Sequence, residues 1–378
     1  SSFVDRGFHH SFYLVEMLTQ EVFKAAETSV VDNLMSKMTL RQKIAQMMMP
    51  DFRKWQTESD SGQKNFQVMN DEVAQIIKDY DFGGVILFAE NVAQTDQTLK
   101  LTTDLQEAAT SGTDGSNIPL LLTIDQEGGI VYRLGSGTAL PGNMALGATR
   151  STDAATQSGE VIGRELSALG INVDFAPVAD VNSNPSNPVI GLRSYGSDPE
   201  LVGSMATASM KGMQKYNIAT AAKHFPGHGD TSEDSHNTLP AVHHDRARLD
   251  SVELYPFKRY IYDGYAGVMT GHLYVPTLDK TRNLPSSFSR PIVTGLLQEE
   301  LGFRGLCFTD ALAMTGATTK KSDNPSVKAL LAGNDILLAP AAPINDFTAV
   351  KEAIDEGILS IEDIEAKCIK ILQYKHIT

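Results

Sequence analysis

A cluster of polar residues in the middle of the chain has the composition of a catalytic site. Lys223 and His224 follow a short apolar run, and Asp234, Ser235 and His236 come shortly after them. Because Asp234 can fix the tautomer of His236 and stabilise its protonated form, this pair is suited to proton transfer near neutral pH. Asp310, at the end of another apolar run, is suited to act as a nucleophile toward an anomeric carbon. Together they predict a nucleophile and a separate acid/base.

Each of these residues also has a purely structural interpretation. Asp310 is an ordinary residue type for a helix N-cap, and an Asp-Ser-His triplet is common in surface turns. Asp125 and Glu127 could cap the helix that follows them, and Arg133 and Arg193 could form structural salt bridges. Lys223 and His224 are harder to explain in this way, because buried polar groups need partners and a sugar hydroxyl is one.

The segment between Lys223 and His236 contains Gly227 and Gly229. Glycine tolerates backbone conformations that other residues avoid, so this pair predicts a loop with the freedom to swing the Asp234–His236 dyad over a bound substrate. His243 and His244 lie beyond this loop beside charged residues, and we expect both on the solvated surface.

Six of the nine histidines fall between positions 224 and 272. Imidazoles together with a carboxylate such as Asp310 are natural zinc ligands, so a metal-dependent hydrolase is one explanation. An amidohydrolase on a barrel would usually place a His-x-His pair after its first strand, where this chain has Met49-Pro50-Asp51-Phe52. This difference favours the explanation without a metal.

Eight apolar runs bounded by turn signals are the elements that position these residues. Each run is nearly continuous, which is typical of a strand buried on both faces of a parallel sheet. Catalytic residues of such folds follow the strand ends, because those ends meet on one face. The predicted strands are Ile44 to Met49, Gly84 to Phe88, Leu120 to Ile124, Ile171 to Val178, Ala219 to Lys223, Gly267 to Thr270, Leu306 to Thr309 and Asp335 to Leu338.

Segments with helical periodicity alternate with these strands. Eight such units favour an α/β fold with a single (β/α)8 TIM-type barrel over the alternative, an open doubly wound sheet. The barrel domain is expected over residues 38–378, preceded by a helical extension over residues 1–37. The predicted helices include Asp71 to Asp79, Ala154 to Leu169, Pro199 to Tyr216 and Ile361 to Leu372.

Composition excludes several classes of function for this chain of 378 residues. A formal net charge of −14 opposes binding to nucleic acid or an anionic membrane surface. No run approaches the about 20 apolar residues of a membrane span. The two cysteines, Cys307 and Cys368, exclude a disulfide framework and are expected to be buried free thiols.

Several motifs resemble one known family. The run KHFPGHG at 223–229, followed by DSH at 234–236 and LP at 239–240, is similar to the signature of family 3 glycoside hydrolases of the β-N-acetylglucosaminidase branch. DQEGG at 125–129 with Arg133, PGNMALG at 141–147, NPVIG at 187–191 with Arg193, and FTDAL at 308–312 with Met314 occur in the family's order. The resemblance covers roughly residues 35–372.

This resemblance implies a role for each matching residue. Asp310 would be the nucleophile of a retaining double displacement, and His236, paired with Asp234, the acid/base. The residues expected to hold the terminal sugar are Asp125, Arg133, Arg193, Lys223, His224 and Met314. No metal or organic cofactor is implied.

The implied activity is that of an exo-acting β-N-acetylglucosaminidase. Its partner would be a GlcNAc-containing glycan, from cell-wall fragments or chitooligosaccharides. The alternatives are a β-glucosidase or a phosphorylase on the same barrel, and a protein that binds GlcNAc without turnover. The missing initiator Met slightly favours an exported chain of the cell envelope, although cytoplasmic recycling fits as well, and the sequence leaves the oligomeric state open.

Overall fold

The computed structural model describes residues 30–113, 115–232, 239–262, 267–315 and 323–377. Most of the predicted N-terminal extension, residues 1–29, lies outside these ranges. Residues 30–37 are helical, and they contribute Val31 to a small core cluster with Cys368 and Leu372 of the C-terminal helix.

Six parallel strands form the main sheet, in the order β4-β5-β6-β7-β8-β9. A second parallel pair joins β1 to β10, and an antiparallel pair joins β2 to β3. The strands are β1 Met48–Met49, β2 Lys54–Trp55, β3 Lys64–Asn65, β4 Gly84–Leu87, β5 Leu121–Ile124, β6 Val173–Asp174, β7 Ala219–Phe225, β8 Gly267–Thr270, β9 Cys307–Thr309 and β10 Leu337–Leu338.

The prediction of a single closed eight-stranded barrel is wrong, although the α/β class is right. The continuous ladder has six strands, and the β1–β10 pair is a separate sheet. Isolated bridges, Asp51 to Ile86 and Phe308 to Ile336, are the ladder contacts recorded between that pair and the edge strands β4 and β9. β1 and β10 pair with each other, and the residues near them reach β4 and β9 only through these single bridges.

Two predicted strands differ from the structure for local reasons. The run Ile44 to Met49 is divided, because Ile44 to Gln46 end a helix that starts after Thr39, whose side chain forms a capping box with Gln42. The run Ile171 to Val178 forms a strand only at Val173–Asp174, with one isolated bridge from Val178 to Lys223 of β7. Pro177 within that run has no N–H to give to a ladder.

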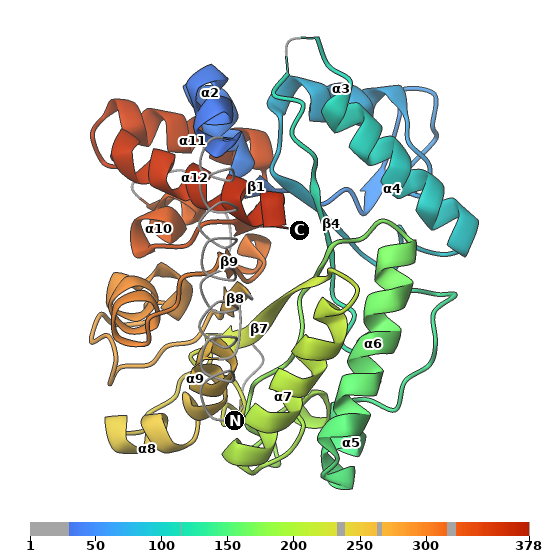
Figure 1. The fold of residues 1–378 in the computed structure, drawn as a ribbon. Helices are drawn as coiled ribbons and strands as arrows, with labels where there is room; N and C mark the ends of the chain where they lie inside the picture. The colour runs from blue at the N-terminus through green and yellow to red at the C-terminus, as the bar shows by residue number, and fades with distance from the viewer. Residues whose placement is uncertain (1–29, 114, 233–238, 263–266, 316–322, 378) are drawn as a thin grey trace, which may run out of the picture.

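Helices follow most strands and cover the sheet (Figure 1). Asn70, Ser151 and Asp198 cap α3, α6 and α7 through their side chains. The predicted helices are confirmed, with small shifts at their ends. The helices are α2 Leu40–Gln46, α3 Asp71–Tyr80, α4 Thr95–Thr110, α5 Asn143–Thr149, α6 Thr152–Ala168, α7 Pro199–Gln214, α8 Arg246–Ser251, α9 Tyr255–Tyr262, α10 Pro325–Ala332, α11 Pro343–Asp355 and α12 Ile361–Ile377, with short 3-10 turns η1 Gly191–Arg193, η2 Ser286–Phe288 and η4 Leu312–Thr315, and the π-helix η3 Pro291–Glu300.

The core lies on both faces of the strands, as their continuous apolar runs require. Every residue of β4, β5, β7 and β8 is buried. Phe175 and Phe308 meet edge to face with their ring centroids 5.2 Å apart. Both cysteines are buried and unbridged, as predicted. Among the described residues, no helix combines the length and apolar character needed to cross a bilayer.

Candidate active site

Polar side chains gather where β5, β6, β7 and β9 end. Asp125 follows β5 directly, Lys223 and His224 lie near the end of β7, and Asp310 follows β9 directly. The hydrogen-bonded order β5-β6-β7-β8-β9 places these ends along one edge of the sheet. In open parallel sheets, this carboxyl edge is where ligands bind.

Lys223 is the central cation of this edge. Its side chain is 2% exposed, and its Nζ lies 2.9 Å from Asp125 Oδ1 and 2.7 Å from Glu127 Oε2. Burial lowers the pKa of Lys223, but the carboxylates of Asp125 and Glu127 outweigh that effect and hold it above its ordinary value. The ammonium is therefore a permanent charge that is already neutralised before any ligand arrives.

Glu127 is the central anion. Arg193 donates to it through two nitrogens, Nε to Oε1 and Nη2 to Oε2, both at 2.8 Å. Burial raises the pKa of Glu127, but the charges of Lys223 and Arg193 have a larger, opposite effect and lower the pKa to about 2. This two-point pairing ties the loop after β6 to the end of β5. Glu127 is not a helix cap, because the next helix, α5, begins only at Asn143.

Arg133 is bound more loosely, with its Nη2 3.9 Å from Asp125 Oδ2 and its side chain 30% exposed. Its backbone N–H donates to Gln126 Oε1 at 2.7 Å, which holds the loop that carries it. Asp125 and Arg133 are thus the more accessible members of the charged cluster, and both keep capacity for a ligand.

Asp180 organises the histidine side of the site. Its Oδ1 accepts from the backbone N–H groups of His224 and His228, at 3.0 and 2.8 Å, and its Oδ2 lies 2.8 Å from His224 Nδ1. Because an ionised carboxylate only accepts, His224 Nδ1 carries the proton in this contact. The ring is held in one orientation, with Nε2 on the opposite side.

Asp310 lies among cationic and polarised groups. Burial raises the pKa of Asp310, but His224, His272, the N–H of Ala311 and Lys223 together hold it below the ordinary value. The Ala311 N–H donates to Asp310 Oδ1 at 2.8 Å, and the backbone N–H of Asp310 donates to Thr270 O at 2.9 Å. The carboxyl group is therefore ionised and fixed, as a nucleophile requires.

His272 supports the backbone beside Asp310. Its Nε2 lies 3.0 Å from the Ala311 carbonyl oxygen and its Nδ1 2.7 Å from Ser287 Oγ. A carbonyl accepts only, so Nε2 carries a proton. Burial lowers the pKa of His272, against the opposing effect of the Asp310 carboxylate.

The structure joins four of the predicted site residues directly or through Glu127: Asp125, Arg133, Arg193 and Lys223. His224 follows Lys223 in β7 and is held separately by Asp180. The electrostatic influence of Lys223 and His224 reaches Asp310. Met314 is half-buried in η4, and no hydrogen bond recorded for the described residues joins its side chain to this cluster. Asp234 and His236 lie outside the described residues.

Sequence reasoning missed three carboxylates of this site as site residues. Glu127 and Asp180 are the shared partners just described, and Asp174 lies behind them, fully buried, accepting from the Gln126 N–H at 2.9 Å. Burial, with Asp125 and Glu127 nearby, raises the pKa of Asp174 well above its ordinary value. The available signal was the occurrence of acidic residues inside or just after apolar strand runs.

Gly229 lies tightly against the chain that follows β6. A Cβ at this position would lie 1.7 Å from the Val181 carbonyl oxygen, so glycine lets two backbones approach closely. Gly227 has φ +127°. Both glycines therefore fit a tightly packed backbone, and freedom of movement is not needed to explain them.

Comparison with known proteins finds one matching family model and several similar enzymes. Residues 39–374 match the family model described as the glycosyl hydrolase family 3 N terminal domain. The chain is 37% identical over 367 residues to the Beta-hexosaminidase A of Pseudoalteromonas piscicida, covering 89% of this chain and 61% of that protein.

Two further relatives have similar names and comparable identity to this chain. The Beta-hexosaminidase of Neisseria meningitidis serogroup C (strain 053442) is 36% identical over 257 residues, covering 66% of this chain and 68% of the relative. A solved glycoside hydrolase family 3 beta-N-acetylglucosaminidase from Paenibacillus sp. str. FPU-7 superposes with a TM-score of 0.83 at 40% identity, covering 90% of this chain and 62% of that one. The chain thus spans about three fifths of the length of the Pseudoalteromonas and Paenibacillus proteins.

Proposed function

Because the chain belongs to glycosyl hydrolase family 3, we propose that it is a retaining exo-β-N-acetylglucosaminidase. Its substrates are GlcNAc-terminated fragments of the cell wall or chitooligosaccharides. The observation that carries this proposal is the ionised carboxyl of Asp310, fixed at the strand-end edge beside a buried, charge-balanced cluster. The names of the Pseudoalteromonas and Paenibacillus relatives support the choice of sugar.

In the first step, Asp310 attacks the anomeric carbon while His236 gives a proton to the leaving oxygen. The glycosidic C–O bond breaks, and a covalent glycosyl ester of Asp310 forms. Asp234 fixes the tautomer of His236 and stabilises its positive charge before transfer.

In the second step, His236 takes a proton from water, and the water oxygen attacks the same carbon. The ester bond breaks, Asp310 returns to a carboxylate, and the sugar leaves with its original configuration. The low pKa of Asp310 favours this departure, since a weaker base is a better leaving group.

The charged cluster holds the terminal sugar. Asp125 and Arg133 are partly exposed and present an acceptor and a donor to hydroxyl groups. Lys223, Arg193 and His224 are largely buried, and Glu127 and Asp180 fix their orientation. Such preorganised polar groups are suited to select one sugar, because an analogue lacking a hydroxyl or amide leaves them unpaired. We assign Met314 to sugar binding from its place in the family motif.

Turnover of 4-nitrophenyl β-N-acetylglucosaminide against the matching β-glucoside tests the proposal. We expect preference for the N-acetyl substrate, and for Asp310→Ala a loss of kcat/KM of roughly 10³-fold or more. Asp104→Ala, which removes a surface ion pair on α4, serves as a control that keeps full activity. Near wild-type turnover by Asp310→Ala, or preference for the glucoside, would contradict the proposal.

The same assay shows whether water or phosphate accepts the sugar from the enzyme. With inorganic phosphate present, hydrolysis releases free GlcNAc, whereas phosphorolysis releases GlcNAc 1-phosphate. We expect free GlcNAc. The phosphorylated sugar as the main product would move the chain to the phosphorylase alternative.

A further inference from the structure

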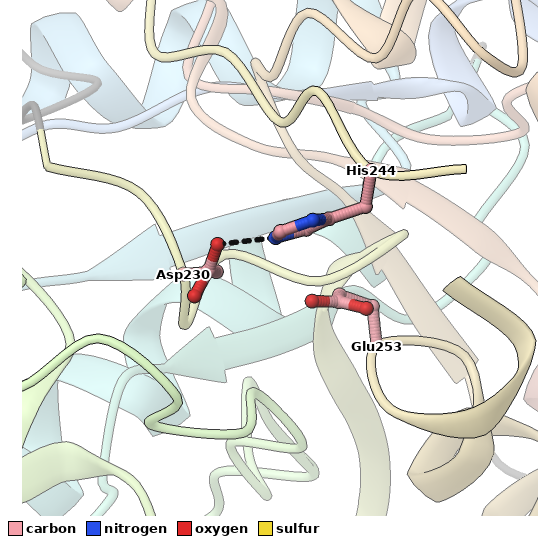
Figure 2. Close-up of side chains that lie close together, drawn as sticks. All are labelled: Asp230, His244 and Glu253. Atoms are coloured by element: carbon pink, nitrogen blue, oxygen red, sulfur yellow. Dashed lines mark hydrogen bonds and ion pairs between the residues drawn. The ribbon is translucent and has the colours of Figure 1, made fainter. Parts of the chain in front are cut away.

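A side-chain hydrogen bond closes the base of the segment that carries the proposed acid/base. Asp230 Oδ2 and His244 Nε2 are 2.5 Å apart, although the two residues are separated by 14 positions in the chain. Figure 2 shows the His244 ring directed at the Asp230 carboxylate. Asp234 and His236 lie between these residues in sequence, so this contact joins the two ends of their segment. The prediction that His244 lies on the solvated surface is therefore wrong, because its side chain is half-buried and hydrogen-bonded to Asp230.

The N-terminal end of the segment is anchored on the loop after β6. Ser183 Oγ donates to Asp230 Oδ1 at 2.7 Å, and Asn187 Nδ2 donates to the His228 carbonyl at 2.8 Å. Burial raises the pKa of Asp230, but Ser183, His244 and Arg248 lower it below the ordinary value. The carboxylate is therefore ionised, and His244 Nε2 donates to it.

The C-terminal end is anchored on the chain after β8. The Val242 N–H donates to the Tyr274 carbonyl at 2.9 Å, and the Tyr274 N–H donates to the Pro240 carbonyl at 2.9 Å. Thr277 Oγ1 donates to the His244 carbonyl at 2.5 Å. The two ends thus rest on different strand-end loops, and the Asp230–His244 contact links those anchors.

Asp230, His244 and Glu253 also have the donor atoms of a metal site, all within 4.8 Å of one another. The Arg248 guanidinium, however, donates to Glu253 Oε1 at 3.1 Å and lies 3.8 Å from Asp230 Oδ1. A permanent cation therefore already lies beside both carboxylates, and it would repel a divalent cation. The arrangement is an ion-pair network that fixes Asp230.

We propose that Asp230 and His244 form a positioning pair for the acid/base step, holding the two ends of the segment with Asp234 and His236 at a set separation. This inference rests on the proposed function. A general acid is sensitive to displacement, since about 1 Å of misplacement can cost about 100-fold in rate. The pair acts through that geometry and touches no substrate.

The leaving group separates this role from a purely structural one. A disaccharide such as chitobiose needs a proton on its leaving oxygen, whereas 4-nitrophenolate leaves with little protonation. For His244→Ala we expect kcat/KM on chitobiose to fall about 10- to 100-fold, and kcat/KM on the aryl substrate to fall only about two- to threefold. His244→Gln, which keeps an N–H donor near the Nε2 position, should restore most of the chitobiose activity.

Two further variants complete the design. His243→Ala removes an exposed neighbouring imidazole and should leave both activities unchanged. His236→Ala should show the same leaving-group dependence as His244→Ala, but more strongly. Equal losses on both substrates in His244→Ala, or no rescue by His244→Gln, would overturn the positioning role while leaving the proposed function intact. Full chitobiose activity in His236→Ala would overturn the acid/base assignment and the positioning role together.

Discussion

The buried carboxylate of Glu127 gives a sharp test of how the site is held together. Glu127→Gln keeps the shape of the side chain and removes its charge, which leaves Arg193 without its two-point partner and Lys223 with Asp125 alone. The Glu127 side chain is 1% exposed, so solvent does not screen these interactions. Losing one partner of a buried ion pair typically costs about 3–5 kcal/mol.

The lowered pKa of Glu127 gives an independent value for the stability that its charge contributes. A shift from 4.5 to about 2 corresponds to about 3 kcal/mol of stability at neutral pH. Because the pKa in the folded protein is lowered, this contribution is fully present above pH 4.5 and is lost as the pH falls toward 2. The gap between wild type and Glu127→Gln should therefore shrink from about 3 kcal/mol at pH 7 to less than half of that at pH 3.

Urea unfolding followed by circular dichroism at several pH values measures this gap. Glu160→Gln is the matched control, because Glu160 pairs with the exposed Lys215 on the helix surface and should cost less than about 1 kcal/mol. A gap below 1 kcal/mol at pH 7, or one that does not change with pH, would refute the reasoning that Glu127 is a charged group whose ionisation is coupled to folding.

Two other predictions concern the histidine side of the site and the nucleophile. Asp180→Ala should destabilise the fold by about 3 kcal/mol or more in urea unfolding, because it leaves the N–H groups of His224 and His228 and the Nδ1–H of His224 without their buried acceptor. A loss no larger than that of Asp104→Ala would argue against this network. Because the pKa of Asp310 is lowered, its carboxyl group should stay ionised below its ordinary pKa of 3.8. In His236→Ala the acid/base no longer titrates, so the acid limb that remains in the pH profile of kcat/KM should lie below pH 3.8. An acid limb at pH 5 or above in that variant would contradict the lowered pKa.

The strands that the sequence predicts best are those whose runs are buried on both faces. Gly267 to Thr270 is found with the predicted bounds, and the runs ending at Ile124 and Thr309 also end as predicted. The pair β2–β3 escapes prediction, because its residues are mostly exposed and lack an apolar run. Closure into a barrel could not be derived from a count of strands, because it depends on how many residues of β1 and β10 enter a ladder.

For the site, the sequence predicts which residues take part but not which partners hold them. Residue type and position after a strand were enough to select Asp125, Lys223, His224 and Asp310. They could not reveal partners distant in sequence, such as Asp180 for His224, 44 positions apart. His244 was assigned to the surface for the same reason, since its charged neighbours in sequence say nothing about Asp230. The roles proposed for Asp234 and His236 rest on the family motif and stay predictions.

Trapping of the covalent intermediate tests the central claim most directly. A 5-fluoro derivative of β-GlcNAc fluoride should glycosylate the enzyme quickly and be released slowly, because fluorine destabilises both transition states while fluoride leaves easily. Mass spectrometry of the digested protein should then find one sugar adduct, on the peptide that contains Asp310, and none in Asp310→Ala. An adduct on another residue, or none from an enzyme that turns over the aryl substrate, would contradict the account.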